Sequence, residues 1–287
     1  SRYLVSSGHD YAINVWDVAN GTLLIELQES VDDRPVRDDL LVTVDWSPDG
    51  SLIAGSRNRT DVSLWDGARI DNCSHEDKLF LKAINSEDYN STFHNWQWSG
   101  DGSRVATQEY DTIYVRDSCD ISIAFSIRTP SRGENLLICM PGNPIMDWSW
   151  DGSKIASASD SYISIWDGED GSHVRDIGHC NVADIDWSSD NSMLSACCGS
   201  IVSLWSAINY RPLNLFQDMA GRSVSLEWNL DSTQLATAGA GVNMWNMTNT
   251  PGKYNADILR YVEFEGTRVN FIHPVGSIGE ILSITRQ

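Results

Sequence analysis

The chain has 287 residues, of which 40 are acidic and 20 basic, giving a formal net charge of −20 and an isoelectric point near 4.4. Apolar residues make up 41% and charged residues 21%, which excludes a disordered or collagen-like chain. No apolar run is long enough for a membrane span. The charge argues against direct binding of nucleic acid, whose phosphates are contacted by Lys and Arg, and suits either a solvated acidic surface or a basic partner.

Two strand patterns alternate along the chain. The first ends in Trp and an acidic turn, at residues 44–50, 98–102, 148–152, 187–190 and 228–231, with a weaker copy at 271–274. The second alternates into Trp, at residues 13–17, 62–66, 113–117, 163–167, 202–205 and 242–245. Period-2 alternation between Asp-Gly turns is typical of antiparallel hairpins, and no sustained helical period accompanies it.

The spacing of the second pattern defines the repeat. The Trp position of this pattern falls at residues 16, 65, 116, 166, 205 and 245, with Arg116 replacing Trp in the third copy. The unit length is thus near 50 residues in the first half of the chain and near 40 in the second half. Units of this length with four short strands predict radial blades that bury their faces against neighbouring blades.

These residues resemble the WD-repeat (WD40) β-propeller family, named for the Trp-Asp dipeptide found here at 16–17, 65–66 and 166–167. The resemblance implies an all-β propeller of four-stranded antiparallel blades that forms one domain over residues 1–287. It implies structural roles for Trp16, Trp65, Trp166, Trp205 and Trp245, and a structural turn Asp at Asp10, Asp61, Asp111 and Asp160. The Gly-His dipeptide of the family stands in its expected place only at Gly178-His179.

The number of blades depends on how the ends are counted. The chain opens in the second strand of one unit and closes after the second strand of a seventh, near residues 280–284. This count favours seven blades, shortened at both ends relative to a complete ring. Six blades are the alternative, closed by residues 267–273 pairing with the N-terminal strands.

Catalytic signatures are absent from the pattern. The six His residues are scattered without an H-x-x-x-H pair, and no G-x-S-x-G elbow occurs. Residues 167–171 superficially resemble a calcium loop but lack its spaced ligands, so a hairpin turn is expected. We therefore predict no catalytic residue, no metal site and no cofactor. The six cysteines fit no dense framework, and buried free thiols are expected.

The long connections predict where a partner binds. Segments 29–39, 85–91 and 129–143 join consecutive units, and the resemblance places them on one rim with the turn Asp residues. Insertions 66–77 and 247–257 are expected on the opposite rim, available to a second partner. We predict a non-catalytic scaffold that binds a protein or peptide, including a basic one, within a larger protein or complex. The predicted contact residues are His9, Arg34, Arg37, Arg59, Thr60, Tyr89, Tyr110 and Arg132.

Two other functions stay open at this point. One is a propeller enzyme or carbohydrate-binding module that uses the central funnel, since 40 acidic residues offer many carboxylate pairs. The other is a structural subunit of a larger assembly, in which the incomplete blades receive a neighbour's strands. Three or more convergent carboxylates with raised pKa values at the axis would favour chemistry, whereas a mixed or apolar rim would favour binding.

Overall fold

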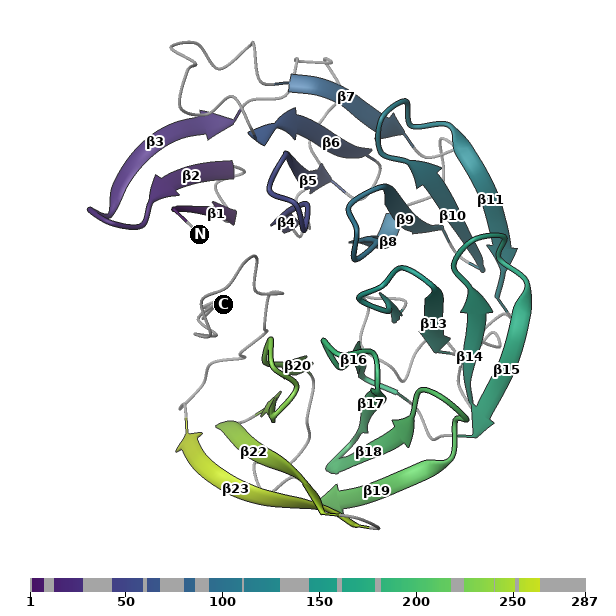
Figure 1. Ribbon diagram of the computed structural model, residues 1–287. Coiled ribbons are helices and arrows are strands. Elements are labelled where there is room, and N and C mark those ends of the chain that lie inside the picture. The colour runs from purple at the N-terminus through teal and green to yellow at the C-terminus, as the bar shows by residue number, and fades with distance from the viewer. Residues whose placement is uncertain are drawn as a thin grey trace.

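The computed structural model describes residues 2–7, 13–27, 43–58, 61–67, 80–85, 93–109, 111–129, 145–158, 162–178, 182–217, 225–239, 241–250 and 253–263. These residues form six antiparallel sheets arranged as blades around a common axis, and no helical element (Figure 1). The predicted all-β propeller of four-stranded blades is confirmed. In this described part, no helix has the length and apolar character needed to cross a membrane.

The blades follow one another in chain order. Blade 1 contains β1 (Tyr3–Ser7), β2 (Ile13–Asp17) and β3 (Thr22–Leu27), and blade 2 contains β4 (Thr43–Trp46), β5 (Leu52–Asn58), β6 (Asp61–Asp66) and β7 (Phe80–Asn85). Blade 3 contains β8 (Phe93–Trp98), β9 (Arg104–Glu109), β10 (Thr112–Asp117) and β11 (Ile123–Arg128). Blade 4 contains β12 (Met146–Trp148), β13 (Lys154–Ala158), β14 (Tyr162–Asp167) and β15 (His173–Gly178). Blade 5 contains β16 (Asp184–Trp187), β17 (Met193–Cys198), β18 (Ile201–Ser206) and β19 (Pro212–Gln217). Blade 6 contains β20 (Ser225–Trp228), β21 (Gln234–Ala238), β22 (Gly241–Thr250) and β23 (Lys253–Glu263).

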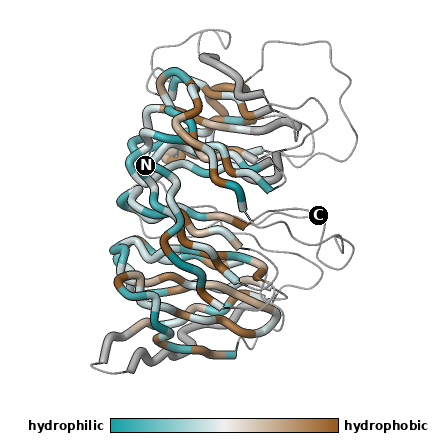
Figure 2. The backbone as a smooth tube through the Cα atoms, turned by 90° about the vertical axis from the view of Figure 1, so that its right-hand side faces the viewer, coloured by the Kyte–Doolittle hydropathy of each residue, from teal (hydrophilic) through white to brown (hydrophobic). Residues whose placement is uncertain are grey.

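Within blades 2 to 6 the strands run in sequence order from the axis outward, and we name these positions a, b, c and d. Blade 1 shows strands b, c and d. Since neighbouring strands are antiparallel, the turns between a and b and between c and d lie at one rim, which we call the ab rim. The turns between b and c lie at the other, the bc rim. Figure 2 shows the ring edge-on, with apolar strand segments lying between more hydrophilic turns.

The same irregularity marks the third strand of every blade. The register between strands c and d shifts at the residue pairs Val15/Trp16, Leu64/Trp65, Val115/Arg116, Ile165/Trp166, Leu204/Trp205 and Met244/Trp245. Such a shift bends the strand and increases its twist, which suits an outer strand that must curve around the blade. Arg116 takes this position in blade 3, so the repeat is preserved where its Trp is missing.

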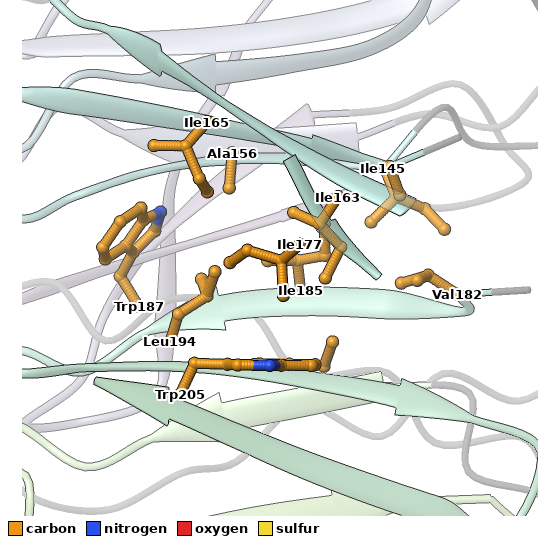
Figure 3. Close-up of a cluster of buried hydrophobic side chains, with 12 residues drawn as sticks. Ile145, Ala156, Ile163, Ile165, Ile177, Val182, Ile185, Trp187, Leu194 and Trp205 are labelled. Atoms are coloured by element: carbon orange, nitrogen blue, oxygen red, sulfur yellow. The ribbon is translucent and has the colours of Figure 1, made fainter. Parts of the chain in front are cut away.

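The core lies between the blades. One cluster joins blade 4 residues such as Ile163 and Ile177 to blade 5 residues such as Ile185, Leu194 and Trp205 (Figure 3). Similar clusters connect blades 1 and 2, blades 2 and 3, blades 3 and 4, and blades 5 and 6. The alternation of apolar residues along each strand supplies both faces of a blade, which explains why every blade needs neighbours.

The blade count stays a prediction. The described residues form six blades, whereas residues 267–273 and 280–284, on which the seventh unit depends, lie outside them. In blade 1, strand b (β1) pairs with strand c (β2). In the other blades, strand b pairs with both strand a and strand c.

One insertion takes a different form from the one expected. Residues 247–257, expected as an insertion on the rim opposite the long connections, largely continue the β22–β23 ladder, where Met247 faces Ala256 and Thr250 faces Lys253. This end of the hairpin extends beyond the other outer strands (Figure 1). The alternating sequence permits the ladder to continue, so the extra residues lengthen two strands. Of the other insertion, residues 68–77 lie outside the described part.

The expectation of buried free thiols holds at only one of the three described cysteines. Cys197 is a free, fully buried thiol, whereas Cys119 is free but exposed. The expectation is wrong at Cys198, which is disulfide-bonded. Because Cys197 and Cys198 are adjacent in β17, their side chains point to opposite faces. Cys197 enters the core between blades 5 and 6, and Cys198 at the end of the strand faces away from it.

Candidate functional site

The predicted contact surface on the bc rim falls outside the described residues. This holds for all eight residues, His9, Arg34, Arg37, Arg59, Thr60, Tyr89, Tyr110 and Arg132. Among the turn Asp residues, Asp10 and Asp160 also lie outside the described part, and of Asp61 only the strand assignment is described. These assignments therefore stay predictions, and Asp111 is the turn Asp whose contacts the structure gives.

Asp111 connects the bc turn of blade 3 to the end of the outer strand. Its carboxylate accepts hydrogen bonds from Thr112 Oγ1 at 3.1 Å and from Arg128 Nε at 3.4 Å. Its carbonyl oxygen accepts bonds from the backbone N–H of Thr129 at 2.6 Å and from Thr129 Oγ1 at 2.9 Å. The side chain of Arg128 is 85% exposed, so this guanidinium is available at the bc rim directly before the long connection 129–143. No repeat motif in the sequence distinguishes Arg128 from the other basic residues.

The ab rim is built from one repeated turn. In blade 4, Ser149 Oγ donates to Asp151 Oδ1 at 2.7 Å and accepts from the Lys154 N–H at 2.8 Å, while the Ser153 N–H donates to Asp151 Oδ1 at 3.0 Å. Blades 2, 3 and 5 repeat this arrangement with the same residue types at the Ser and Asp positions. Partial burial raises the pKa of the Asp151 carboxyl, but the hydrogen bonds outweigh it and hold the pKa below its ordinary value. Four charged carboxylates at this rim are therefore committed to turn structure.

Neighbouring ab turns are also bonded to one another. The Asp151 N–H donates to Asn191 Oδ1 of blade 5 at 3.2 Å, and the Asp190 N–H donates to Ser232 Oγ of blade 6 at 2.9 Å. Asn191 and Ser232 have left-handed backbone, with φ values of 57° and 58°, where blades 2 to 4 have glycine. A side chain at this strained position supplies the acceptor that links two blades. This rim is thus a continuous, internally bonded surface from blade 4 to blade 6.

Carboxylates of the inner strands face the axis and connect the blades there. Asp147 Oδ2 of β12 accepts from the Trp187 N–H of β16 at 3.0 Å, and Asp186 Oδ2 accepts from the Trp228 N–H of β20 at 2.7 Å. An inner strand has one edge without a neighbouring strand, so its N–H groups require other acceptors. The acceptor is the acidic residue that precedes the inner-strand Trp of the previous blade, which is Asp147 before Trp148 and Asp186 before Trp187. We call these bonds the axial carboxylate bonds.

Asp184, a further acidic residue of the inner strands, has a raised pKa. Asp184 Oδ2 accepts from the Leu226 N–H at 2.8 Å. Burial raises the pKa of Asp184 to about 7, and the nearby charge of Asp147 acts in the same direction, against the hydrogen bonds from Leu226 and Ser225. Since Asp147, Asp184 and Asp186 all accept backbone N–H bonds from the next blade, the arrangement is that of structural acceptors. In the described part, no group of three or more His, Cys, Asp or Glu side chains could hold a metal ion.

The repeated Trp of strand c is anchored by a hydroxyl of strand b. Trp16 Nε1 donates to Ser6 Oγ and Trp166 Nε1 to Ser157 Oγ, each at 2.8 Å. Trp245 Nε1 donates to Thr237 Oγ1 at 3.0 Å. An indole N–H removed from water requires an acceptor, so the Ser or Thr two residues after the strand-b partner of the Trp is part of the repeat. The sequence pattern gave the Trp positions but not these acceptors.

Comparison with known proteins supports the repeat directly. The WD40 family (WD domain, G-beta repeat) matches residues 141–167 and 171–206, which contain most of blade 4 and much of blade 5. These two segments of the chain are thus similar to WD repeats. It is also 26% identical over 161 residues to "Cell division cycle 20.1, cofactor of APC complex" of Arabidopsis thaliana, a match that covers 55% of this chain. The chain spans about 30% of the length of that relative.

WD repeats are generally non-catalytic and serve as scaffolds for protein interaction, and the Arabidopsis relative is named as a cofactor of a complex, not as an enzyme. The geometry of the propeller described above agrees with this class. The carboxylates nearest the axis accept main-chain hydrogen bonds, and those of the ab rim hold turns.

Proposed function

We propose that this WD-repeat propeller is a non-catalytic scaffold that binds a protein or peptide partner on the bc rim, at the surface carrying connections 29–39, 85–91 and 129–143. The observation that supports it most is the use of the acidic groups. Asp147 and Asp186 of the inner strands bond adjacent blades, and the Ser-bonded Asp residues of the ab rim hold turns, which leaves the bc rim for recognition. Loops on a rigid scaffold are common binding surfaces.

The chemistry of the partner follows from the charge. With 40 acidic residues against 20 basic ones, the chain attracts a basic segment over long range, while rim Arg and Tyr side chains anchor it locally. Arg128, exposed beside Asp111, adds one cation to this surface. By analogy with the relative, whose name describes a cofactor of the APC complex, we propose that the chain acts within a larger complex.

The test is a pull-down from the native source with the full chain. Arg34, Arg37, Arg128 and Arg132 are each changed to Ala, which removes the anchor without adding a charge that would attract a basic segment, singly and together. Arg2→Ala serves as the single-site control on the ab rim, where Arg2 is 62% exposed. We expect the partner to be lost in the bc-rim variants and kept by the control. Retention of the partner by the combined variant would place the site elsewhere and contradict the proposal.

A further inference from the structure

An open groove of about 1000 Å³ lies between the outer parts of blades 4 and 5. Its wall is the outer strand β15, from Arg175 to Gly178, and its floor is the face of β18 and β19. The turn with Tyr210 and Arg211 closes the end at the ab rim. The groove therefore runs along the circumference of the propeller, from the ab rim at the turn with Tyr210 to the bc-rim ends of β15 and β18 at Gly178 and Ile201.

The strand register explains why this face is only half covered. Residues 201, 203 and 205 alternate onto one face of β18, and Ser203 is paired with Leu215 of β19. Trp205, towards the ab-rim end of β18, is 5% exposed and packs into the core shared with blade 4 (Figure 3). Ile201, at the bc-rim end of β18, and Leu215 of the outer strand β19 are 37% and 64% exposed. Blade 4 thus covers the face around Trp205 and leaves its apolar part at Ile201 and Leu215 open.

The charge around the groove is opposite to that of the chain as a whole. Arg175 and Arg211 both line it and both are exposed. Arg175 is held in place by the bond from its Nη1 to the Asn209 carbonyl oxygen of blade 5 at 3.0 Å. The one carboxylate of the lining, Asp176, already accepts from Ser164 Oγ and faces His173 Nε2, each at 2.8 Å. In a chain of net charge −20, this groove offers two guanidinium groups next to exposed apolar side chains.

We propose that this groove binds an extended segment of a partner protein in which acidic side chains flank a large apolar side chain. The carboxylates pair with Arg175 and Arg211, whose planar guanidinium groups suit bidentate bonding to carboxylates, and the apolar side chain covers Ile201 and Leu215. The site goes beyond the bc-rim surface, because it prefers the opposite charge in its ligand and lies on different elements. It is independent of whether the bc rim binds a partner.

The experiment selects a phage-displayed library of short random peptides on the full chain and, in parallel, on the Arg175→Glu/Arg211→Glu variant. We expect the peptides enriched on the unaltered chain alone to be acidic with at least one large apolar residue. Fluorescence anisotropy with an enriched peptide should show about tenfold weaker binding to the double variant and a similar loss in Leu215→Asp. Raising the salt concentration should weaken binding, since the groove is open to solvent.

Arg2→Glu is the matched control, since it reverses an exposed Arg of blade 1, whereas the groove lies between blades 4 and 5. It should bind the peptide within about twofold of the unaltered chain. Circular dichroism must show the same thermal unfolding for all variants. Enriched peptides that are basic, or that bind the double variant as tightly as the unaltered chain, would overturn the proposal. So would failure to enrich any peptide that distinguishes the two chains. Failure of the bc-rim pull-down leaves this result unaffected.

Discussion

The inner-strand Trp residues show how one residue in a repeat changes the hydrogen bonding of a buried indole. Trp228 Nε1 donates to Ser195 Oγ of the preceding blade at 3.0 Å. The repeat places Ala54, Ala106 and Ala156 at the corresponding b-strand positions of blades 2 to 4. The indole N–H groups of the Trp residues that follow, Trp98, Trp148 and Trp187, have no acceptor within the described part. Ser195 therefore differs from the Ala of the other blades, because its hydroxyl accepts the indole N–H of the next blade's Trp.

We predict opposite effects from exchanging these two residue types. Ser195→Ala should lower the free energy of unfolding by about 1 to 2 kcal/mol, because the Trp228 N–H loses its acceptor. Ala156→Ser should raise it by about 1 kcal/mol, since Trp187 then gains an acceptor; the indole nitrogen lies on the Ala156 side of the ring (Figure 3). Urea denaturation measures both. A loss of stability in Ala156→Ser and in the parallel variant Ala106→Ser would contradict this explanation.

The raised pKa of Asp184 predicts that the free energy of unfolding depends on pH. Its pKa is about 7 in the folded state against 3.8 as the ordinary value, so between these pH values the folded chain binds more protons than the unfolded chain. The contribution of this group to the unfolding free energy thus falls as pH rises from about 4 to about 7, by at most about 1.4 kcal/mol per unit. Asp184→Asn keeps an acceptor for Leu226 and should flatten the dependence. Unfolding in urea at about pH 5 and about pH 8 measures it; an unchanged difference between the two pH values would refute the assignment.

At the scale of elements, a close contact between the ab turns of neighbouring blades explains one glycine of the repeat. Gly100 of blade 3 lies against the backbone of Trp150 in the ab turn of blade 4, and an added Cβ would overlap the Trp150 carbonyl group. The sequence alone indicates only that this glycine belongs to a local turn. The structure shows that the close approach of the next blade requires it.

This contact predicts that Gly100→Ala destabilises the chain by about 2 kcal/mol or more, because either turn must move. Gly178→Ala is the matched control, since a Cβ there meets nothing within 4 Å. The control should be neutral or slightly stabilising. Thermal and urea unfolding of the two variants should separate them clearly, and equal stabilities would show that the two turns do not touch in solution.

At the scale of the whole molecule, the ring is held by bonds at two radii. The axial carboxylate bonds join blades 4, 5 and 6 at the centre, and the core clusters join adjacent blades further out. Arg104 adds a bond at the ab rim, from its Nη1 to the Gly168 carbonyl oxygen of the next blade at 2.6 Å. Because each blade packs against its neighbours, removing one axial carboxylate bond should lower the free energy of unfolding of the whole propeller.

Asp186 tests this dependence. Asp186→Ala removes the acceptor of the Trp228 N–H from a site where Asp186 is 2% exposed, and we expect a loss of about 1 to 3 kcal/mol in unfolding free energy. Asp186→Asn retains an acceptor oxygen and should recover most of the loss. Equal destabilisation by both substitutions would mean that the charge, rather than the hydrogen bond, is what the site requires.

The sequence by itself determined the repeat. Alternating apolar residues, the Trp positions and the Ser-x-Asp-Gly turns are local features, because side-chain period and turn conformation depend on residues close in the chain. They predicted the all-β blades, the hairpin at residues 167–171 and the third-strand Trp positions that later coincide with the register shifts.

The tertiary structure decided what those repeats do to each other. The axial carboxylate bonds join residues 40 and 42 positions apart, and the Ser195–Trp228 contact joins residues 33 positions apart. These contacts and the groove between β15 and β19 all depend on the angle between two blades. In the sequence, Asp186 is one of 40 acidic residues and Arg211 one of 20 basic ones. Their roles arise because packing the blades side by side leaves inner-strand N–H groups in need of acceptors and an outer face partly uncovered, and neither condition exists within a single repeat.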